Sequence, residues 1–150
     1  MHSLRQRLNV RDESAFTLIE LLVVLIIIGV LLAIAIPSYL GFQKKAQQTA
    51  AASDVRSAIP DAEVYFSDNN SYTGMTAAGL QTTYDTGMQL FKAAAAGSPE
   101  VPGIVTADAN NDATGQTFCI SAKDNGYWAH VVGPGGTVKE DGQVAADPCP

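Results

Sequence analysis

The feature that most constrains this chain is an uninterrupted apolar run near its amino terminus. Residues 21–36 contain no polar side chain, and Phe16, Leu18 and Ile19 extend the run backward. As a helix, residues 16–36 would measure about 31 Å, close to the roughly 30 Å thickness of the hydrocarbon core of a bilayer. The run therefore predicts a helix that crosses a membrane.

Basic residues precede the run at Arg5, Arg7 and Arg11. Because arginines ahead of a first span keep that end of the chain in the cytoplasm, we expect the carboxyl-terminal part to be exported. A cleavable secretory signal is the alternative, since residues 33–35 offer an A-x-A-like site. The run is longer than the usual apolar region of such a signal, about 7–15 residues, and it contains a carboxylate. Amino-terminal sequencing would separate a mature chain that starts at Ile36 from an anchored one that starts at Phe16.

The composition excludes several other classes of protein. The chain has 150 residues and a net charge of −6, with nine Lys and Arg against fifteen Asp and Glu. This balance argues against a nucleic-acid-binding domain, which would carry a basic patch. A hydrophobic content of 47% is too high for a disordered chain. Two cysteines are too few for a cysteine-dense scaffold or a four-cysteine zinc site.

Glu20 is a carboxylate inside the apolar run. An acidic side chain in a bilayer costs about 2.5–3.5 kcal/mol on insertion scales and usually marks function. The alternative is that Glu20 lies at the headgroup boundary, where the cost is small. The surrounding sequence FTLIELLVV, residues 16–24, closely resembles the class III signal of type IV prepilins and pseudopilins, and the resemblance continues through Gly29 and Pro37 to about Tyr65.

This resemblance implies how the chain is processed and assembled. A prepilin peptidase would remove the leader, residues 1–15, by cleaving between Ala15 and Phe16, and would methylate the new amino group of Phe16. Glu20 would then pair with the amino-terminal amine of a neighbouring subunit, because buried opposite charges are tolerable only when paired. Ala15 stands where the family usually has glycine.

Residues 38–66 change to an amphipathic pattern that predicts a soluble helix continuing the membrane segment, residues 16–37. Pro37 and Pro60 predict kinks, and at Pro60 a break of the helix is also open. The polar side of the helix includes Gln43, Lys44, Gln47, Asp54 and Asp61. The apolar stripe comprises Phe42, Ala46, Thr49, Ala52, Val55, Ile59, Ala62 and Phe66.

Residues 67–150 are predicted to form an exported head. Turn residues end the helix at 67–71, a polar loop follows to about residue 87, and residues 89–96 predict a short helical turn. The clearest strands are 117–121 and 127–132, which flank the hairpin turn 124–126; further strands are expected at 103–106 and 137–139, the latter after a turn at 133–136. The fold class is therefore α+β, with a small antiparallel sheet packed on the exported half of the long helix, as the resemblance to pilins also implies.

Cys119 and Cys149 both lie in the predicted exported head. A disulfide between them would stabilise the fold by about 3.5–4 kcal/mol through loop closure and would hold the tail, residues 145–150. Two independent free thiols are the alternative. Among the proteins that the chain resembles, such a carboxyl-terminal disulfide is common in pilins and less common in pseudopilins.

The sequence contains no evident catalytic constellation. His2 lies in the predicted leader and His130 stands alone in a predicted strand, so no nucleophile with a base can be assembled. The glycine-rich residues 133–136 lack the lysine and the helix of a phosphate loop. We therefore expect that the chain is not an enzyme.

Asp108, Asn110 and Asp112 match the start of a calcium-binding EF-hand loop. Ala113 replaces the glycine of that motif and Cys119 replaces its bidentate glutamate, so an EF-hand is not expected. A looser calcium loop and a polar surface loop with Asx turns are the two alternatives. No other cofactor is expected.

From the resemblance to prepilins we expect the chain to be a structural subunit of an extracellular type IV pilus-like filament. The first alternative is a pseudopilin of a type II secretion system. Less favoured are a minor pilin whose head binds DNA or an adhesion target, and a signal-anchored enzyme. Lys44 and Lys45 are the only adjacent basic pair that could offset the charge of DNA. The expected partners are other copies or related subunits, the prepilin peptidase, the inner-membrane assembly machinery and the membrane. The expected location is the inner membrane for the single-pass precursor and the pilus or periplasmic pseudopilus for the mature form.

Overall fold

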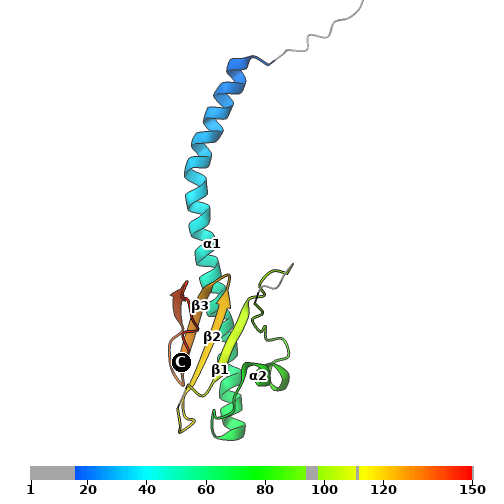
Figure 1. Ribbon diagram of the computed structural model, residues 1–150, viewed down its shortest axis with the longest axis vertical. Coiled ribbons are helices and arrows are strands. Elements are labelled where there is room, and N and C mark those ends of the chain that lie inside the picture. The colour runs from blue at the N-terminus through cyan, green and yellow to red at the C-terminus, as the bar shows by residue number, and fades with distance from the viewer. Residues whose placement is uncertain (1–15, 94–97, 111, 150) are drawn as a thin grey trace, which may run out of the picture. The chain divides into compact units, whose positions relative to one another are not determined.

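The computed structural model describes residues 16–93, 98–110 and 112–149 (Figure 1). The chain forms two compact units, which meet between Leu40 and Gly41. The predicted leader lies outside the described residues. The helix α1, Leu18–Asn69, contributes to both units.

In the first unit, every described side chain is exposed. The described residues contain one helix, α1, that is long and apolar enough to cross a membrane, judged by length and composition. An exposed helix that is apolar all round needs an apolar environment, either lipid or other helices. This agrees with the predicted membrane segment.

In the second unit, α1 packs against a four-stranded antiparallel sheet with strand order β1-β2-β3-β4 (Figure 1). The strands are β1, Gly103–Asp108; β2, Phe118–Asp124; β3, Tyr127–Gly133; and β4, Lys139–Gly142. The α+β prediction is confirmed. The core is made by small residues of α1 that let the sheet approach closely and by larger residues of the strands, among them Ala51, Val55, Ala58, Ala62, Phe118, Ile120 and Val131.

The amphipathic stripe is only partly the one that the sequence predicts. Ala52, Val55 and Ala62 are buried as expected, and Ile59 and Phe66 pack against the core. The start of the predicted stripe, Phe42, Ala46 and Thr49, is exposed. The sheet instead covers a face centred on alanines, including Ala51 and Ala58, which spacing alone does not distinguish from their neighbours.

The helix does not break at Pro60, so that alternative is wrong. Pro60 is exposed, while Ala58 and Ala62 on either side of it are buried against the sheet. Packing of the flanking turns compensates for the lost hydrogen bond, and the freed carbonyl can reach water. The helix ends at Asn69, three residues after the predicted end, because Asn70 adopts a left-handed conformation (φ 52°) and its N–H donates to the carbonyl of Phe66 at 2.7 Å.

Two predictions between residues 72 and 93 are wrong. A short helix, α2, Ala77–Thr83, lies in the stretch predicted to be loop; Thr76 caps it by accepting a hydrogen bond from the N–H of Gly79. Residues 89–93 form no helical turn. The carbonyl of Gln89 accepts from the N–H of Ile104, and the N–H of Phe91 donates to the carbonyl of Ile104, so this segment pairs with the edge of β1. Residues 94–96 of that prediction lie outside the described part of the chain.

The strand predictions are confirmed with small changes in length. The β2–β3 hairpin turns at Asn125 and Gly126, which both have positive φ angles, as a tight two-residue turn requires. The strands β1, β2 and β3 run slightly longer than predicted, and β4 begins two residues later than expected.

Candidate functional site

The amino terminus of α1 is closed by three reciprocal hydrogen bonds between Thr17 and Glu20. The backbone N–H and the hydroxyl of Thr17 donate to Oε2 of Glu20 at 2.9 and 2.7 Å, and the N–H of Glu20 donates to Oγ1 of Thr17 at 3.3 Å. This is a capping box, which satisfies backbone donors that a helix start leaves unpaired. The capping box corresponds to the T-x-x-E pattern at residues 17–20, a signal in the sequence from which it could have been predicted.

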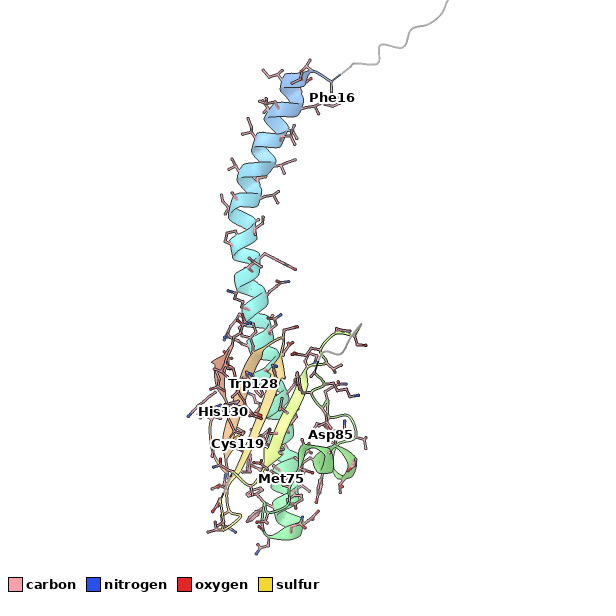
Figure 2. The ribbon with its side chains drawn as sticks, in the orientation of Figure 1. Phe16, Met75, Asp85, Cys119, Trp128 and His130 are labelled. Carbon is pink, nitrogen blue, oxygen red and sulfur yellow. A yellow bond between two sulfur atoms is a disulfide. The ribbon has the colours of Figure 1, made fainter. Side chains whose placement is uncertain are left out.

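The capping box gives Glu20 a role in the single chain. Hydrogen bonds to Thr17 hold its carboxylate at the first turn of the helix. A negative charge at this position interacts favourably with the positive end of the helix dipole. Phe16, the predicted first residue of the processed chain, is described and exposed (Figure 2). Ala15 and the rest of the leader lie outside the described residues, so the structure contains only one side of the predicted cleavage site.

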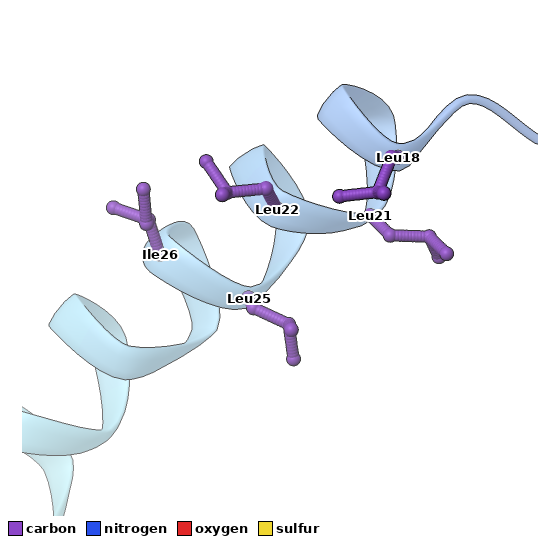
Figure 3. A pocket seen from close by; sticks show the side chains of 5 residues that line it. All are labelled: Leu18, Leu21, Leu22, Leu25 and Ile26. Atoms are coloured by element: carbon purple, nitrogen blue, oxygen red, sulfur yellow. The ribbon is translucent and has the colours of Figure 1, made fainter.

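An apolar groove lies along the first turns of the same helix (Figure 3). Its volume is about 460 Å³. Residues three and four positions apart form two adjacent ridges of branched side chains, a surface into which another apolar helix or a lipid chain can pack. The groove is lined by Leu18, Leu21, Leu22, Leu25 and Ile26.

In the second unit, the predicted disulfide joins Cys119 of β2 to Cys149, with the two Cα atoms 5.7 Å apart. Both cysteines are buried. Asp147 fastens the same tail, because its carboxylate accepts hydrogen bonds from the hydroxyl of Thr106 on β1 and from the N–H of Cys149. The carboxyl-terminal tail is therefore attached to two strands, covalently and by hydrogen bonds.

Among the candidate calcium residues, Asp112 is engaged by groups of its own loop. Asp112 organises its loop by accepting hydrogen bonds from the backbone and hydroxyl groups of Thr114 and Thr117 and from the N–H of Gln116. These bonds, led by that from the Thr114 side chain, lower the pKa of Asp112 to about 2. Asp108 ends β1, and burial followed by the nearby charge of Asp147 raises its pKa. Residues 16–93, 98–110 and 112–149 contain no group of three or more His, Cys, Asp or Glu side chains that could hold a metal ion.

His130 is not alone, as the sequence suggested, because its Nδ1 pairs with the carboxylate of Asp141 next to it on β4. Ser121 lies opposite His130 in the β2–β3 register and is fully buried. The hydroxyl of Ser121 has no hydrogen-bond partner among the described residues. Three residue types of a hydrolase triad are thus near one another, but the hydrogen bond between nucleophile and base that the chemistry requires is not formed.

Lys123 lies between two aromatic rings, a feature that the sequence predictions missed. Its Nζ is 4.8 Å from the ring centre of Phe91 and 5.4 Å from that of Trp128. It also forms an ion pair with Glu100 at 3.8 Å. The cluster fastens the segments that contain Phe91 and Glu100 to the sheet. Only the tertiary fold brings these distant positions together.

Like charges face each other along the buried edge of α1. Burial, followed by the nearby charge of Asp124, raises the pKa of Asp54. Burial, followed by the nearby charge of Asp85, raises the pKa of Asp61. These carboxylates lie where the helix meets the sheet and α2, so they weaken the head when ionised.

Comparison with known proteins identifies the amino-terminal segment. Residues 10–36 match the family model described as the prokaryotic N-terminal methylation motif. No solved structure matches the chain.

Three similar proteins belong to two kinds of assembly. The chain is 43% identical over 77 residues to the type IV wide pilus major component PilA4 of Thermus thermophilus, an alignment that covers 49% of this chain and 59% of that protein. It is 39% identical over 62 residues to the type II secretion system core protein G of Aeromonas hydrophila, covering 41% and 43%. It is 39% identical over 67 residues to the type IV major pilin protein PilA of Myxococcus xanthus, covering 45% and 30%. The chain thus spans between about a third and three fifths of the length of these relatives.

Proposed function

We propose that this chain, whose residues 10–36 carry a prepilin-type methylation motif, is a structural subunit of a type IV pilus-like filament. One observation carries the proposal. Residues 18–36 of the motif lie in a helix whose described side chains are all exposed through Leu40 and apolar over residues 21–36, with Glu20 held at its first turn. Such a helix is suited to pass from lipid into a bundle of identical helices.

Processing creates a positive charge that can pair with Glu20, which has no cationic partner among the described residues. Cleavage between Ala15 and Phe16 exposes a new amino group, which the peptidase methylates and which stays cationic. Because a carboxylate inside an apolar bundle is tolerable only beside an opposite charge, Glu20 selects the position at which the Phe16 amine of a neighbouring subunit lies next to it. The groove at Leu18–Ile26 receives apolar side chains of that neighbour.

The partners follow from this assembly. They are further copies of the chain or related subunits, the prepilin peptidase and the inner-membrane assembly machinery. The precursor crosses the inner membrane once, with the head exported, and the mature form lies in a surface pilus. An oxidising compartment for the head is supported by the disulfide between Cys119 and Cys149.

The second candidate is a pseudopilin of a type II secretion system, which the similarity to core protein G of Aeromonas hydrophila favours. The disulfide in the head favours the pilus. Electron microscopy of cells with and without this protein separates the two, because a pilin accounts for long surface filaments. Loss of protein secretion without loss of such filaments would favour the pseudopilin.

Two variants of Glu20 test the assembly role. Glu20→Ala removes both the cap and the charge, whereas Glu20→Gln keeps a side chain that can close the capping box but carries no charge. Both variants should enter the membrane, and both should fail to form filaments in electron micrographs. Normal filaments from Glu20→Gln would contradict the proposed pairing with the Phe16 amine.

Amino-terminal sequencing and mass spectrometry test the processing. The mature chain should begin at a methylated Phe16. A start at Ile36 would instead indicate removal of the whole helix. Ala15→Gly, which restores the usual residue of the family, should be cleaved at least as completely as the natural chain.

Two further properties stay predictions. We propose that the chain has no catalytic activity, which the structural roles named for its relatives support. Calcium binding at Asp108, Asn110 and Asp112 is tested by calorimetric titration of the purified protein. Absence of heat at millimolar calcium would dispose of that site.

A further inference from the structure

We propose that the exposed face of α1 in the head is a docking surface for a second copy of this chain, with Arg56 of one subunit paired to Glu63 of the next. This inference rests on the proposed filament function and deepens it. It names the residues that bring neighbouring heads into register.

The part of α1 in the second unit has two different faces. One face is buried against the sheet through Ala51, Val55, Ala58 and Ala62. The opposite face is exposed and is built mainly from small side chains, so another subunit could approach it closely. It consists of Ser53, Arg56, Ser57, Pro60, Glu63, Val64 and Ser67.

Arg56 and Glu63 are the charged residues on this face, and they lie on one line along the helix. Seven residues correspond to about 10.5 Å along the axis and about 20° around it. Within the described residues, neither side chain has an ion-pair or hydrogen-bond partner. Lys45 and Lys123, in contrast, are paired with Glu140 and Glu100. The two opposite charges on the face are therefore available to another molecule.

A second copy supplies the complementary charges at the right spacing. If a parallel copy is shifted along the axis by two helical turns, Arg56 of one subunit lies level with Glu63 of the other. Each subunit then pairs through Arg56 with one neighbour and through Glu63 with another. The contact is therefore heterologous and can repeat along a filament without closing. Open, repeated contacts of this kind build a filament, and parallel orientation is what chains inserted into one membrane in the same direction share.

Cysteine cross-linking tests the geometry. Arg56→Cys/Glu63→Cys cannot form a disulfide within one chain, because cysteines that far apart on a helix exceed the roughly 7 Å limit between Cα atoms. In filaments from cells that express the assembly machinery, oxidation should give a ladder of covalent multimers. Each single variant should give dimers at most. Ser53→Cys/Ser67→Cys, on the same face but with a different spacing, is the matched control and should give no ladder.

The other cross-linking outcomes count against the proposal. Dimers without a ladder from the double variant would indicate a closed antiparallel pair. Intact filaments without any cross-link would show that this face of α1 does not contact the same face of a neighbouring subunit. Both results overturn the docking surface while the proposed filament function stands. Absence of filaments from the natural chain would overturn both.

Charge exchange tests the pairing. Arg56→Glu or Glu63→Arg alone should reduce filament yield, since an exposed ion pair contributes about a two- to fivefold factor in each contact. The combined variant Arg56→Glu/Glu63→Arg restores opposite charges and should restore the yield. Failure of the combined variant to recover would overturn the proposed pair, whereas recovery distinguishes pairing from a general loss of folding.

Discussion

Phe118 and Gly133 face each other across β2 and β3, and the phenyl ring fills the space that a side chain at position 133 would need. A Cβ atom on residue 133 would lie 2.1 Å from Cζ of Phe118. Phe118 is almost fully buried, and its ring packs against that of Tyr72 at 4.8 Å. The glycine therefore permits the aromatic contact between Phe118 of the sheet and Tyr72 in the segment after α1.

Gly133→Ala should destabilise the head by about 1–3 kcal/mol, because the added methyl group overpacks a filled core. Unfolding by denaturant in detergent, followed by the fluorescence of Trp128, the only tryptophan in the chain, measures the change. Gly41→Ala adds the same group where no atom lies within 4 Å. This control should be neutral or slightly stabilising, and equal losses in the two variants would contradict the explanation.

Removal of the disulfide by Cys119→Ser/Cys149→Ser should lower the free energy of unfolding by about 3.5–4 kcal/mol. The loss arises because the unfolded chain regains the freedom that the closed loop denied it. The same unfolding measurement applies. Mass spectrometry of the natural protein should show a gain of two hydrogens on reduction, and no gain would mean that the bond is absent.

Lys123→Met should destabilise the head by about 1–2 kcal/mol, since it keeps the aliphatic stem but removes the charge from between Phe91 and Trp128. It also leaves Glu100 without its cation. The emission of Trp128 should shift as its surroundings change. Lys92→Met, at an exposed position, is the control. A destabilisation of the control as large as that of Lys123→Met would contradict a specific role for the cluster.

Asp54→Asn should stabilise the head at pH 7. The folded-state pKa of Asp54 is raised, first by burial and then by the charge of Asp124. The stability that the protonated carboxyl contributes is therefore fully present below pH 3.8, and it is lost as the pH rises through the folded-state pKa. The variant should therefore gain in melting temperature at neutral pH and lose that gain below about pH 3.8. Glu63→Gln, on the exposed face of the same helix, is the matched control. A gain that does not depend on pH would argue against ionisation as the cause.

Asp112→Ala should loosen the loop before β2 and remove one component of acid sensitivity. The pKa of Asp112 is lowered to about 2. The stability that its ionised carboxylate contributes to the head is therefore present above pH 3.8 and is lost as the pH falls toward 2. The natural protein should lose stability in this interval more steeply than the variant does. Parallel acid titrations of the two proteins would reveal the difference, and identical curves would count against the role of Asp112.

The elements that the sequence predicts well are those with local causes. Asn125 and Gly126 supply the two positive φ angles of a tight hairpin, and the flanking residues alternate as strands do. The apolar run and the T-x-x-E cap at Thr17 are equally local. The segment at residues 89–93, in contrast, has a conformation that is not set by local sequence. Its strand-like pairing is set by Ile104 on β1, which offers unpaired backbone groups at the edge of the sheet.

The sequence by itself determined the membrane-type helix, the processing motif and the α+β class, because each depends on residue type and short-range spacing. It left a disulfide and two free thiols open at Cys119 and Cys149, which the fold brings together. Only the tertiary structure decided which face of α1 is buried, that Lys123 meets Phe91 and Trp128, and that Arg56 and Glu63 remain exposed together. These relationships depend on which distant backbone segments the sheet brings close, and packing against a neighbour can override both helix periodicity and a proline at position 60.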